Sequence, residues 1–214
     1  MATRRLPVYI LADCSGSMQG QPIEAVKQGI KTLHSELMGD PQAVESAVLS
    51  VITFDSSSRQ VAPLSDLQSF NPPDLSAGGT TALGAAIQTL LDCIDREVQK
   101  GTAEQKADWK PLVFLLTDGN PTDNWQSAAA DLKARKYNVI AVAVGENTVE
   151  TGLLKQVTET VLVLKDMSPN GFAAFFKWVS ASIKQTSAKC GSQPETAGAG
   201  VALPPPPPQI IITP

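Results

Sequence analysis

The sequence predicts an α/β fold: a Rossmann-like three-layer sandwich around a six-stranded, mostly parallel sheet with one short antiparallel edge strand. Short apolar runs alternate with longer segments of helical period, which is typical of a parallel sheet covered by helices on both faces. The length of 214 residues suits one α/β domain with a tail. A composition of 43% hydrophobic and 18% charged residues provides for a sizeable buried core.

Six apolar runs are the expected strands. The first, Leu6–Ala12, follows two arginines but is short and has no signal-peptide cleavage site, so we interpret it as a buried strand. The run Leu112–Leu116 is the most apolar and is expected at the centre of the sheet. The run Gln60–Leu64 includes a proline, which favours a short strand at the edge. The other expected strands are Val48–Phe54, Val139–Val144 and Val161–Leu164.

Segments of helical period separate these runs. The first begins near Pro22, which suits an initial helical position, and Gly39-Asp40-Pro41 is expected to end it. A second amphipathic helix is expected from Leu83 to Val98. The remaining expected helices lie around Leu132, around Leu153-Leu154, and between Phe172 and Ile183.

The composition changes after about Thr186, so we expect one folded domain over residues 1–186 and a flexible Pro/Gly-rich tail over residues 187–214. The tail includes five consecutive prolines, Pro204–Pro208, followed by Gln209–Ile212. Such a run forms a polyproline II segment. Either it is a spacer, or it is a ligand for a domain of the SH3 or WW type.

Charge and cysteine content exclude several classes of function. The net charge of −4 and the absence of a Lys/Arg block argue against binding to nucleic acid or to an anionic membrane. No apolar stretch approaches the roughly 20 residues of a membrane helix. The three cysteines, Cys14, Cys93 and Cys190, have no C-x-x-C spacing, which argues against a disulfide framework and a zinc knuckle. We therefore expect a cytoplasmic protein.

Three polar clusters lie where expected strands end or helices begin. They are Asp13-Cys14-Ser15-Gly16-Ser17, Gly78-Gly79-Thr80-Thr81 and Thr117-Asp118-Gly119. In an open parallel sheet, ligands bind beyond the carboxyl ends of the strands, so these clusters could converge there. Their carboxylates and hydroxyls are the hard oxygen ligands that Mg²⁺ prefers, and they contribute no thiolate for zinc. The alternative interpretation is that each cluster only caps the next helix.

The side chains of the first cluster are expected to share a face, because alternation along an extended chain turns residues 13, 15 and 17 to one side. Gly16 would let the backbone bend around an ion, and Gly78-Gly79 would let the threonine loop approach closely. Cys14 lies out of phase with these residues, and we interpret it as a small residue that fills space.

The three clusters, in this order, resemble the metal-ion-dependent adhesion site (MIDAS) of von Willebrand factor type A (VWA) domains, and the resemblance covers roughly residues 6–185. It implies a Mg²⁺ site, with Mn²⁺ or Ca²⁺ also possible, and an open position that accepts a carboxylate from a partner protein. Ser15 and Ser17 would bind the ion directly, Thr81 would be a third contact, and Asp13 and Asp118 would bind directly or through water.

Some points of this resemblance stay open. Thr80 is an alternative to Thr81 as the threonine ligand. More narrowly, the compact domain resembles the bacterial TerY type of tellurium-resistance clusters, which is associated with a protein kinase and a protein phosphatase. The implied function is therefore a metal-dependent protein–protein interaction module in such a system.

An enzyme is the alternative. Mg²⁺-dependent phosphatases and phosphotransferases of the haloacid-dehalogenase type also place an Asp-x-Asp loop after their first strand. Here Ser15 replaces the second carboxylate, which would act as the general acid. Walker A and Gly-x-Gly-x-x-Gly patterns are absent, and the single histidine, His34, fits a structural role on the first helix. We therefore predict that the chain is not an enzyme.

Loops beside the clusters are expected to shape the partner surface. They include Pro72-Pro73 and the segment from Pro121 to Trp125. Asp123 and Asn124 fit a turn and helix cap better than additional ligands. Trp125 is either an aromatic anchor for the partner or a residue that packs over the start of its own helix.

Overall fold

The computed structural model describes residues 4–102, 106–145, 150–192 and 203–213, but not the side chains of residues 190–192. A short 3₁₀ helix, η1, spans Gly16–Met18. The α-helices are α1 (Gln21–Met38), α2 (Pro41–Ser46), α3 (Leu83–Glu97), α4 (Gln126–Ala134), α5 (Thr151–Val157) and α6 (Pro169–Ser192). The strands are β1 (Leu6–Asp13), β2 (Ala47–Phe54), β3 (Ser58–Asp66), β4 (Leu112–Thr117), β5 (Asn138–Val144), β6 (Thr160–Leu164) and β7 (Ile210–Ile212).

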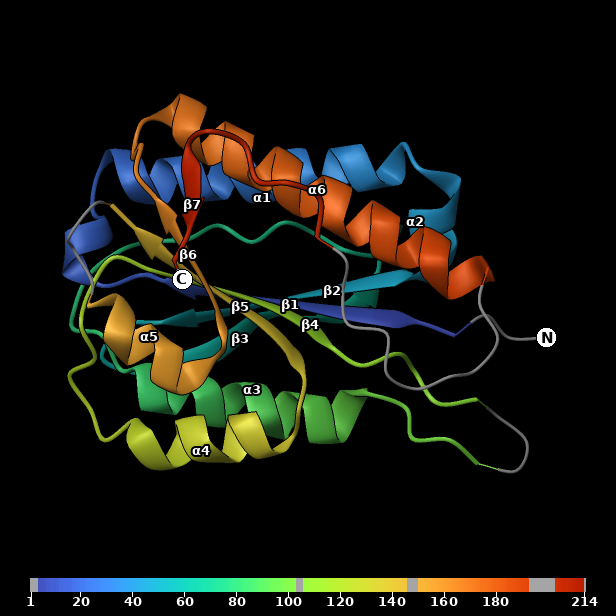
Figure 1. Cartoon of the computed structure of the whole chain (residues 1–214), viewed down its shortest axis with the longest axis horizontal. Coiled ribbons are helices and arrows are strands. Elements are labelled where there is room, and N and C mark those ends of the chain that lie inside the picture. The colour runs from blue at the N-terminus through green and yellow to red at the C-terminus, as the bar shows by residue number, and fades with distance from the viewer. Residues whose placement is uncertain (1–3, 103–105, 146–149, 193–202, 214) are drawn as a thin grey trace.

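The strands form one sheet in the order β3-β2-β1-β4-β5-β6-β7. Pairing is parallel from β2 to β6 and antiparallel at both edges. Helices α1, α2 and α6 cover one face, and α3, α4 and α5 cover the other (Figure 1). The predicted α/β three-layer sandwich is therefore confirmed, with seven strands rather than six.

The central strands are apolar throughout because helices cover both of their faces. Every residue of β1, β2 and β4 is buried. The core accordingly has two halves, one packed under α1 and α6 and the other under α3 and α4. The prediction that Leu112–Leu116 lies centrally is confirmed, since β4 is the fourth strand of the seven.

The edge strand β3 is longer than predicted. It spans nine residues rather than the five from Gln60 to Leu64, and its pairing with β2 is irregular on either side of Val51. Pro63 lies within it, where an edge position tolerates the missing N–H. The full length of β3 could not be predicted from the sequence because polar residues occupy both ends of the strand.

The short helix α2 follows α1 directly, where the sequence indicated only the end of a helix. The carboxylate of Asp40 accepts a hydrogen bond from the backbone N–H of Ala43 (2.9 Å), and Pro41 occupies the first turn of α2. The Asp-Pro pair therefore ends one helix and begins the next, as its capping chemistry allows.

Parts of the expected tail belong to the fold. Helix α6 continues to Ser192, beyond the expected boundary at residue 186, and Ile210–Ile212 pairs with Leu162–Leu164 as β7. Ile210 is only 4% exposed. The seventh strand thus comes from residues that the sequence assigned to a flexible segment, and residues 193–202 of that segment lie outside the described chain.

No helix in the described part of the chain combines the length and hydrophobicity that a membrane span requires.

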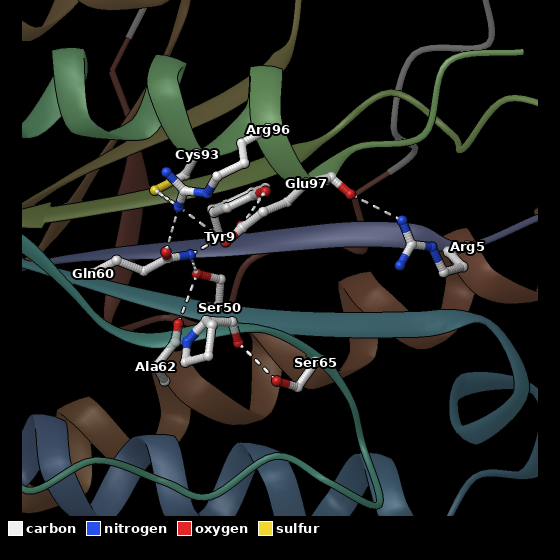
Figure 2. Close-up of polar contacts among 10 residues, drawn as sticks. Arg5, Tyr9, Ser50, Gln60, Ala62, Ser65, Cys93, Arg96 and Glu97 are labelled. Atoms are coloured by element: carbon white, nitrogen blue, oxygen red, sulfur yellow. Dashed lines mark hydrogen bonds and ion pairs between the residues drawn. The ribbon is translucent and has the colours of Figure 1, made fainter.

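A partly buried polar network joins the C-terminal end of α3 to the sheet; we call it the α3 network (Figure 2). One oxygen of Glu97 accepts hydrogen bonds from the Tyr9 hydroxyl (3.1 Å) and the Gln60 amide (2.9 Å). The Gln60 amide also donates to the Ser50 hydroxyl (3.0 Å), and Arg96 donates to the other Glu97 oxygen (3.2 Å). The network therefore connects β1, β2 and β3 to one helix end.

Candidate metal centre

The three polar clusters converge at the carboxyl ends of β1 and β4. Asp13 is the last residue of β1 and Thr117 the last of β4, and the register pairs Ala12 with Leu116 directly before them. The strand order reverses between these two strands, which is where open α/β sheets bind ligands.

Asp13 is completely buried and held by two hydrogen bonds. Its Oδ1 accepts from the backbone N–H of Ser15 (2.8 Å), and its Oδ2 accepts from the hydroxyl of Thr117 (2.6 Å). Because both carboxylate oxygens are fixed, the orientation of Asp13 is set before any ligand binds. This positioning role of Thr117 was not predicted from the sequence, although its place before Asp-Gly at a strand end is a usable signal.

Ser15, Ser17 and Asp118 form a chain of oxygen atoms beside Asp13. The two serine hydroxyl oxygens lie 3.1 Å apart, and Ser17 donates to Asp118 Oδ1 at 2.7 Å. Ser15 is buried, whereas Ser17 is exposed. The predicted convergence holds, but its predicted cause was wrong: η1 turns the chain after Ser15, so the residues do not alternate along an extended segment.

The threonine loop brings Thr81 rather than Thr80 toward Gly119, in the third polar cluster. Thr81 is 6% exposed, and its Oγ1 lies 3.0 Å from where a Cβ on Gly119 would be. Thr80 is exposed and donates from its backbone N–H (3.1 Å) and its hydroxyl (3.3 Å) to Ser56 Oγ. Of the two candidates, only the Thr81 side chain faces the rest of the cluster.

Glycines hold the threonine loop against the first cluster. The N–H of Gly16 donates to the Gly79 carbonyl (3.0 Å), and the N–H of Gly78 donates to the Cys14 carbonyl (2.8 Å). Gly79 has a φ of 80°, and a Cβ there would lie 2.6 Å from Ser56 Oγ. Position 79 therefore requires glycine for both its conformation and its close approach.

The segment after β4 fixes the other side of the threonine loop. The hydroxyl of Thr122 accepts from the Thr81 N–H (3.2 Å), and the Thr122 N–H donates to the Thr81 carbonyl (2.9 Å). Asp123 accepts from the N–H groups of Gly84 (3.0 Å) and Ala85 (2.9 Å). The predicted capping role of Asp123 is confirmed, but on α3 rather than on the helix that follows it. Nothing in the sequence indicates which loops meet here.

Trp125 packs inside the protein. It is 4% exposed and belongs to the half-core under α3 and α4. The prediction of an aromatic anchor for a partner is therefore wrong, and the packing alternative is confirmed.

Cys14 and His34 also have structural roles. Burial raises the pKa of the Cys14 thiol to about 12, so it is an inert filler as predicted. His34 lies on α1, where its Nε2 is 2.7 Å from the Leu67 carbonyl and its ring packs against Phe70.

The centre has excess negative charge. Burial raises the pKa of Asp13 despite its hydrogen bonds from Thr117 and Ser15, and the nearby Asp118 raises it further. Burial also raises the pKa of Asp118, against the hydrogen bond from Ser17. Within residues 4–102, 106–145, 150–192 and 203–213, neither carboxylate forms an ion pair.

The donor set consists of oxygen atoms. In the described residues, no three His, Cys, Asp or Glu side chains gather as a metal-binding group, so hydroxyls supplement the two carboxylates here. Such a set suits a hard divalent cation with oxygen ligands.

Comparison with known proteins agrees with this architecture. The family model described as the von Willebrand factor type A domain matches residues 8–168. A search of curated proteins gives no match.

Solved structures with the same fold include proximal thread matrix protein 1 from the mussel byssus with a zinc-occupied MIDAS motif. It has 20% identity and a TM-score of 0.61, with 85% of this chain and 48% of that chain covered. A von Willebrand factor type A protein from Catenulispora acidiphila has 23% identity and a TM-score of 0.64, with 86% and 43% covered. The pilus adhesin SpaC from Lactobacillus rhamnosus GG has 13% identity and a TM-score of 0.66, with 87% and 31% covered. The chain thus spans about half the length of the mussel protein and less of the other two.

Proposed function

We propose that this chain, which belongs to the von Willebrand factor type A domain family, is a metal-dependent protein–protein interaction module. The family match includes every residue of the candidate metal centre. The zinc-occupied MIDAS motif of the mussel relative supports a divalent ion at the equivalent place.

The proposed ligands are Asp13, Ser15, Ser17, Thr81 and Asp118, and the proposed ion is Mg²⁺, with Mn²⁺ or Ca²⁺ as substitutes. One observation carries this assignment: two buried carboxylates lie in one hydroxyl-lined cluster without a cationic side chain in the described residues. Isolated buried charges are costly unless they are paired or bind a metal. The bound ion would supply positive charge and an open coordination position.

We infer that the partner contributes an Asp or Glu side chain to the ion. The three hydroxyl ligands are neutral, so the cation keeps an affinity for a further carboxylate in a partly buried site. Among the described residues, no histidine or lysine hydrogen-bonds or ion-pairs with the centre to act as a base, and the Cys14 thiol is protonated and buried, which supports a binding role over catalysis.

Calorimetric titration of the full chain with Mg²⁺ tests the metal assignment. One site per chain is expected, and it should be lost in Asp13→Ala and in Asp118→Ala. Undiminished binding in both variants would refute the ligand set.

Affinity for a partner tests the interaction role. The partner is first identified by pull-down from native lysate with Mg²⁺, with Asp13→Ala as the control bait. Its affinity should then fall in EDTA and on neutralising one acidic residue of the partner. An affinity that survives both changes would mean that the interaction surface lies elsewhere.

The narrower assignment is a TerY-type role in the cytoplasm beside a protein kinase and a protein phosphatase. Its support is the sequence resemblance and the cysteine usage, including the free thiols of Cys14 and Cys93. Recovery of a kinase or phosphatase in the same pull-down is expected. Recovery of neither would contradict this assignment and leave the metal-dependent module intact.

A further inference from the structure

The segment 203–213, which we call the C-terminal hairpin, is attached to the domain at both ends. Leu203 packs against the half-core under α6, and Ile210 is buried. Between them, the indole N–H of Trp178 on α6 donates to the Pro204 carbonyl at 2.9 Å. Figure 1 shows the polyproline stretch running along α6 before β7 returns beside β6.

The first four prolines of this hairpin, Pro204–Pro207, are restricted to extended conformations. Each ring fixes its own φ near −65°, and each of these residues also precedes a proline, which disfavours helical backbone. This restriction favours polyproline II geometry, with three residues per turn. Pro208 begins the turn before β7, in which the Ile210 N–H donates to the Pro207 carbonyl (2.9 Å). Pro205 and Pro208 are exposed, whereas Pro204, Pro206 and Pro207 are half-buried. The exposed prolines are three apart, so they lie on one ridge that faces away from α6.

The hairpin surface is apolar and uncharged. Among the described residues, the exposed large hydrophobic side chains are Met38, Ile211 (40% exposed) and Ile212 (57% exposed), and two of these three lie in the hairpin. No charged residue occurs from Leu203 to Thr213. A partner would therefore recognise shape and apolar surface here rather than charge.

We propose that the C-terminal hairpin is a docking surface for a protein domain whose groove is lined by aromatic side chains. Such grooves, as in SH3, WW and EVH1 domains, bind polyproline II helices through alternate prolines. The anchors at Trp178, Leu203 and Ile210 hold the ridge in its binding conformation, which lowers the entropic cost of association.

This surface is separate from the candidate metal centre. In the sheet, β7 is three strands away from β4 and four from β1, which corresponds to about 14–19 Å at the usual strand spacing. Binding at the hairpin is therefore independent of the metal.

The test titrates the full chain with a panel of three isolated domains, one each of the SH3, WW and EVH1 classes. At least one domain should bind, with the same affinity in Mg²⁺ and in EDTA. The double variant Pro205→Ala/Pro208→Ala should weaken binding about tenfold or more, as expected for central contacts. The matched control is Pro207→Ala, a half-buried proline of the same run, and it should change affinity less than about twofold.

Circular dichroism and thermal unfolding establish that each variant remains folded. Three outcomes would overturn the proposal: no binding by any domain of the panel, undiminished binding by the double variant, or a larger loss in Pro207→Ala than in the double variant.

Discussion

The candidate metal centre and the α3 network lie at opposite ends of α3. Thr81 comes two residues before this helix, and Glu97 is its last residue, so about 22 Å of helix separates the two clusters. Both clusters are polar, partly buried and connect several strands of the sheet. In the α3 network, one carboxylate, Glu97, lies beside one guanidinium, Arg96. In the metal centre, Asp13 and Asp118 lie together with no cationic partner in the described chain.

Charge balance, rather than the number of hydrogen bonds, distinguishes a structural cluster from a binding site here. Every member of the α3 network has a partner within the protein, so the network stabilises the fold without a ligand. The carboxylates of the metal centre are also hydrogen-bonded, yet burial still raises their pKa values. No cationic side chain in the described part of the chain pairs with them, which is why we propose that an added cation balances their charge.

The largest expected difference between the clusters is their response to metal. Mg²⁺ at about 100 times its Kd should stabilise the wild-type protein by about 2.7 kcal/mol, which raises the Tm by roughly 5–10 °C. Asp13→Ala should abolish this increase because it removes a ligand. Scanning calorimetry of the wild-type protein and of Asp13→Ala, each with Mg²⁺ and with EDTA, measures the two changes in Tm. The control Tyr9→Phe should keep the full increase in Tm. An equal loss of this increase in both variants would contradict the idea that only the metal centre responds to Mg²⁺.

The second effect concerns the α3 network alone. Glu97→Ala removes the acceptor of the Tyr9 hydroxyl and one acceptor of the Gln60 amide, so the free energy of unfolding should fall by about 2 kcal/mol. Mg²⁺ affinity should not change. Urea denaturation and calorimetric titration measure the two quantities. Arg96→Ala is the matched control: its side chain is 61% exposed, so it should cost less than about 1 kcal/mol.

The central strands could be predicted from sequence because they are buried on both faces and therefore read as continuous apolar runs. The strand β7 could not, because it has three residues, follows five prolines, and exists through its pairing with β6. Helix α2 has only six residues, too few for a helical period to emerge.

Individual residues of the candidate metal centre were predictable from their order along the chain, but their supports were not. Thr117 and Thr122 act through hydrogen bonds to other loops, and sequence alone does not indicate which loops meet. The choice between Thr80 and Thr81 as the candidate ligand could not be made from the sequence, because only the structure shows that the Thr80 hydroxyl donates to Ser56.

This choice leads to a smaller predicted effect within the metal centre. Thr81→Ala should weaken Mg²⁺ binding about tenfold, equivalent to about 1.4 kcal/mol, because it removes one neutral ligand and leaves both carboxylates. Thr80→Ala, the adjacent control, should leave the affinity unchanged because its hydroxyl is bonded to Ser56. Calorimetric titration of the two variants compares them directly. The reverse ranking would reassign the ligand to Thr80.

The smallest effect is expected for Tyr9→Phe in the α3 network. The change removes one hydrogen bond, while Glu97 keeps the Gln60 amide and Arg96 as partners, so the cost at neutral pH should be about 1 kcal/mol. Alkaline pH should shrink this difference. Burial, followed by the charge of Glu97, raises the pKa of Tyr9 above its ordinary value of 10.0.

Above pH 10 the unfolded chain therefore releases the Tyr9 proton while the folded chain keeps it. Because the unfolded state then binds fewer protons, this residue makes the free energy of unfolding fall as pH rises, by at most about 1.4 kcal/mol per pH unit. Tyr9→Phe lacks this contribution, so its stability should fall less steeply between pH 10 and 11. Urea denaturation in EDTA over this range, at constant ionic strength, gives both slopes. Parallel slopes would show that Tyr9 titrates normally, and would mean that the α3 network is more open to water than its burial indicates.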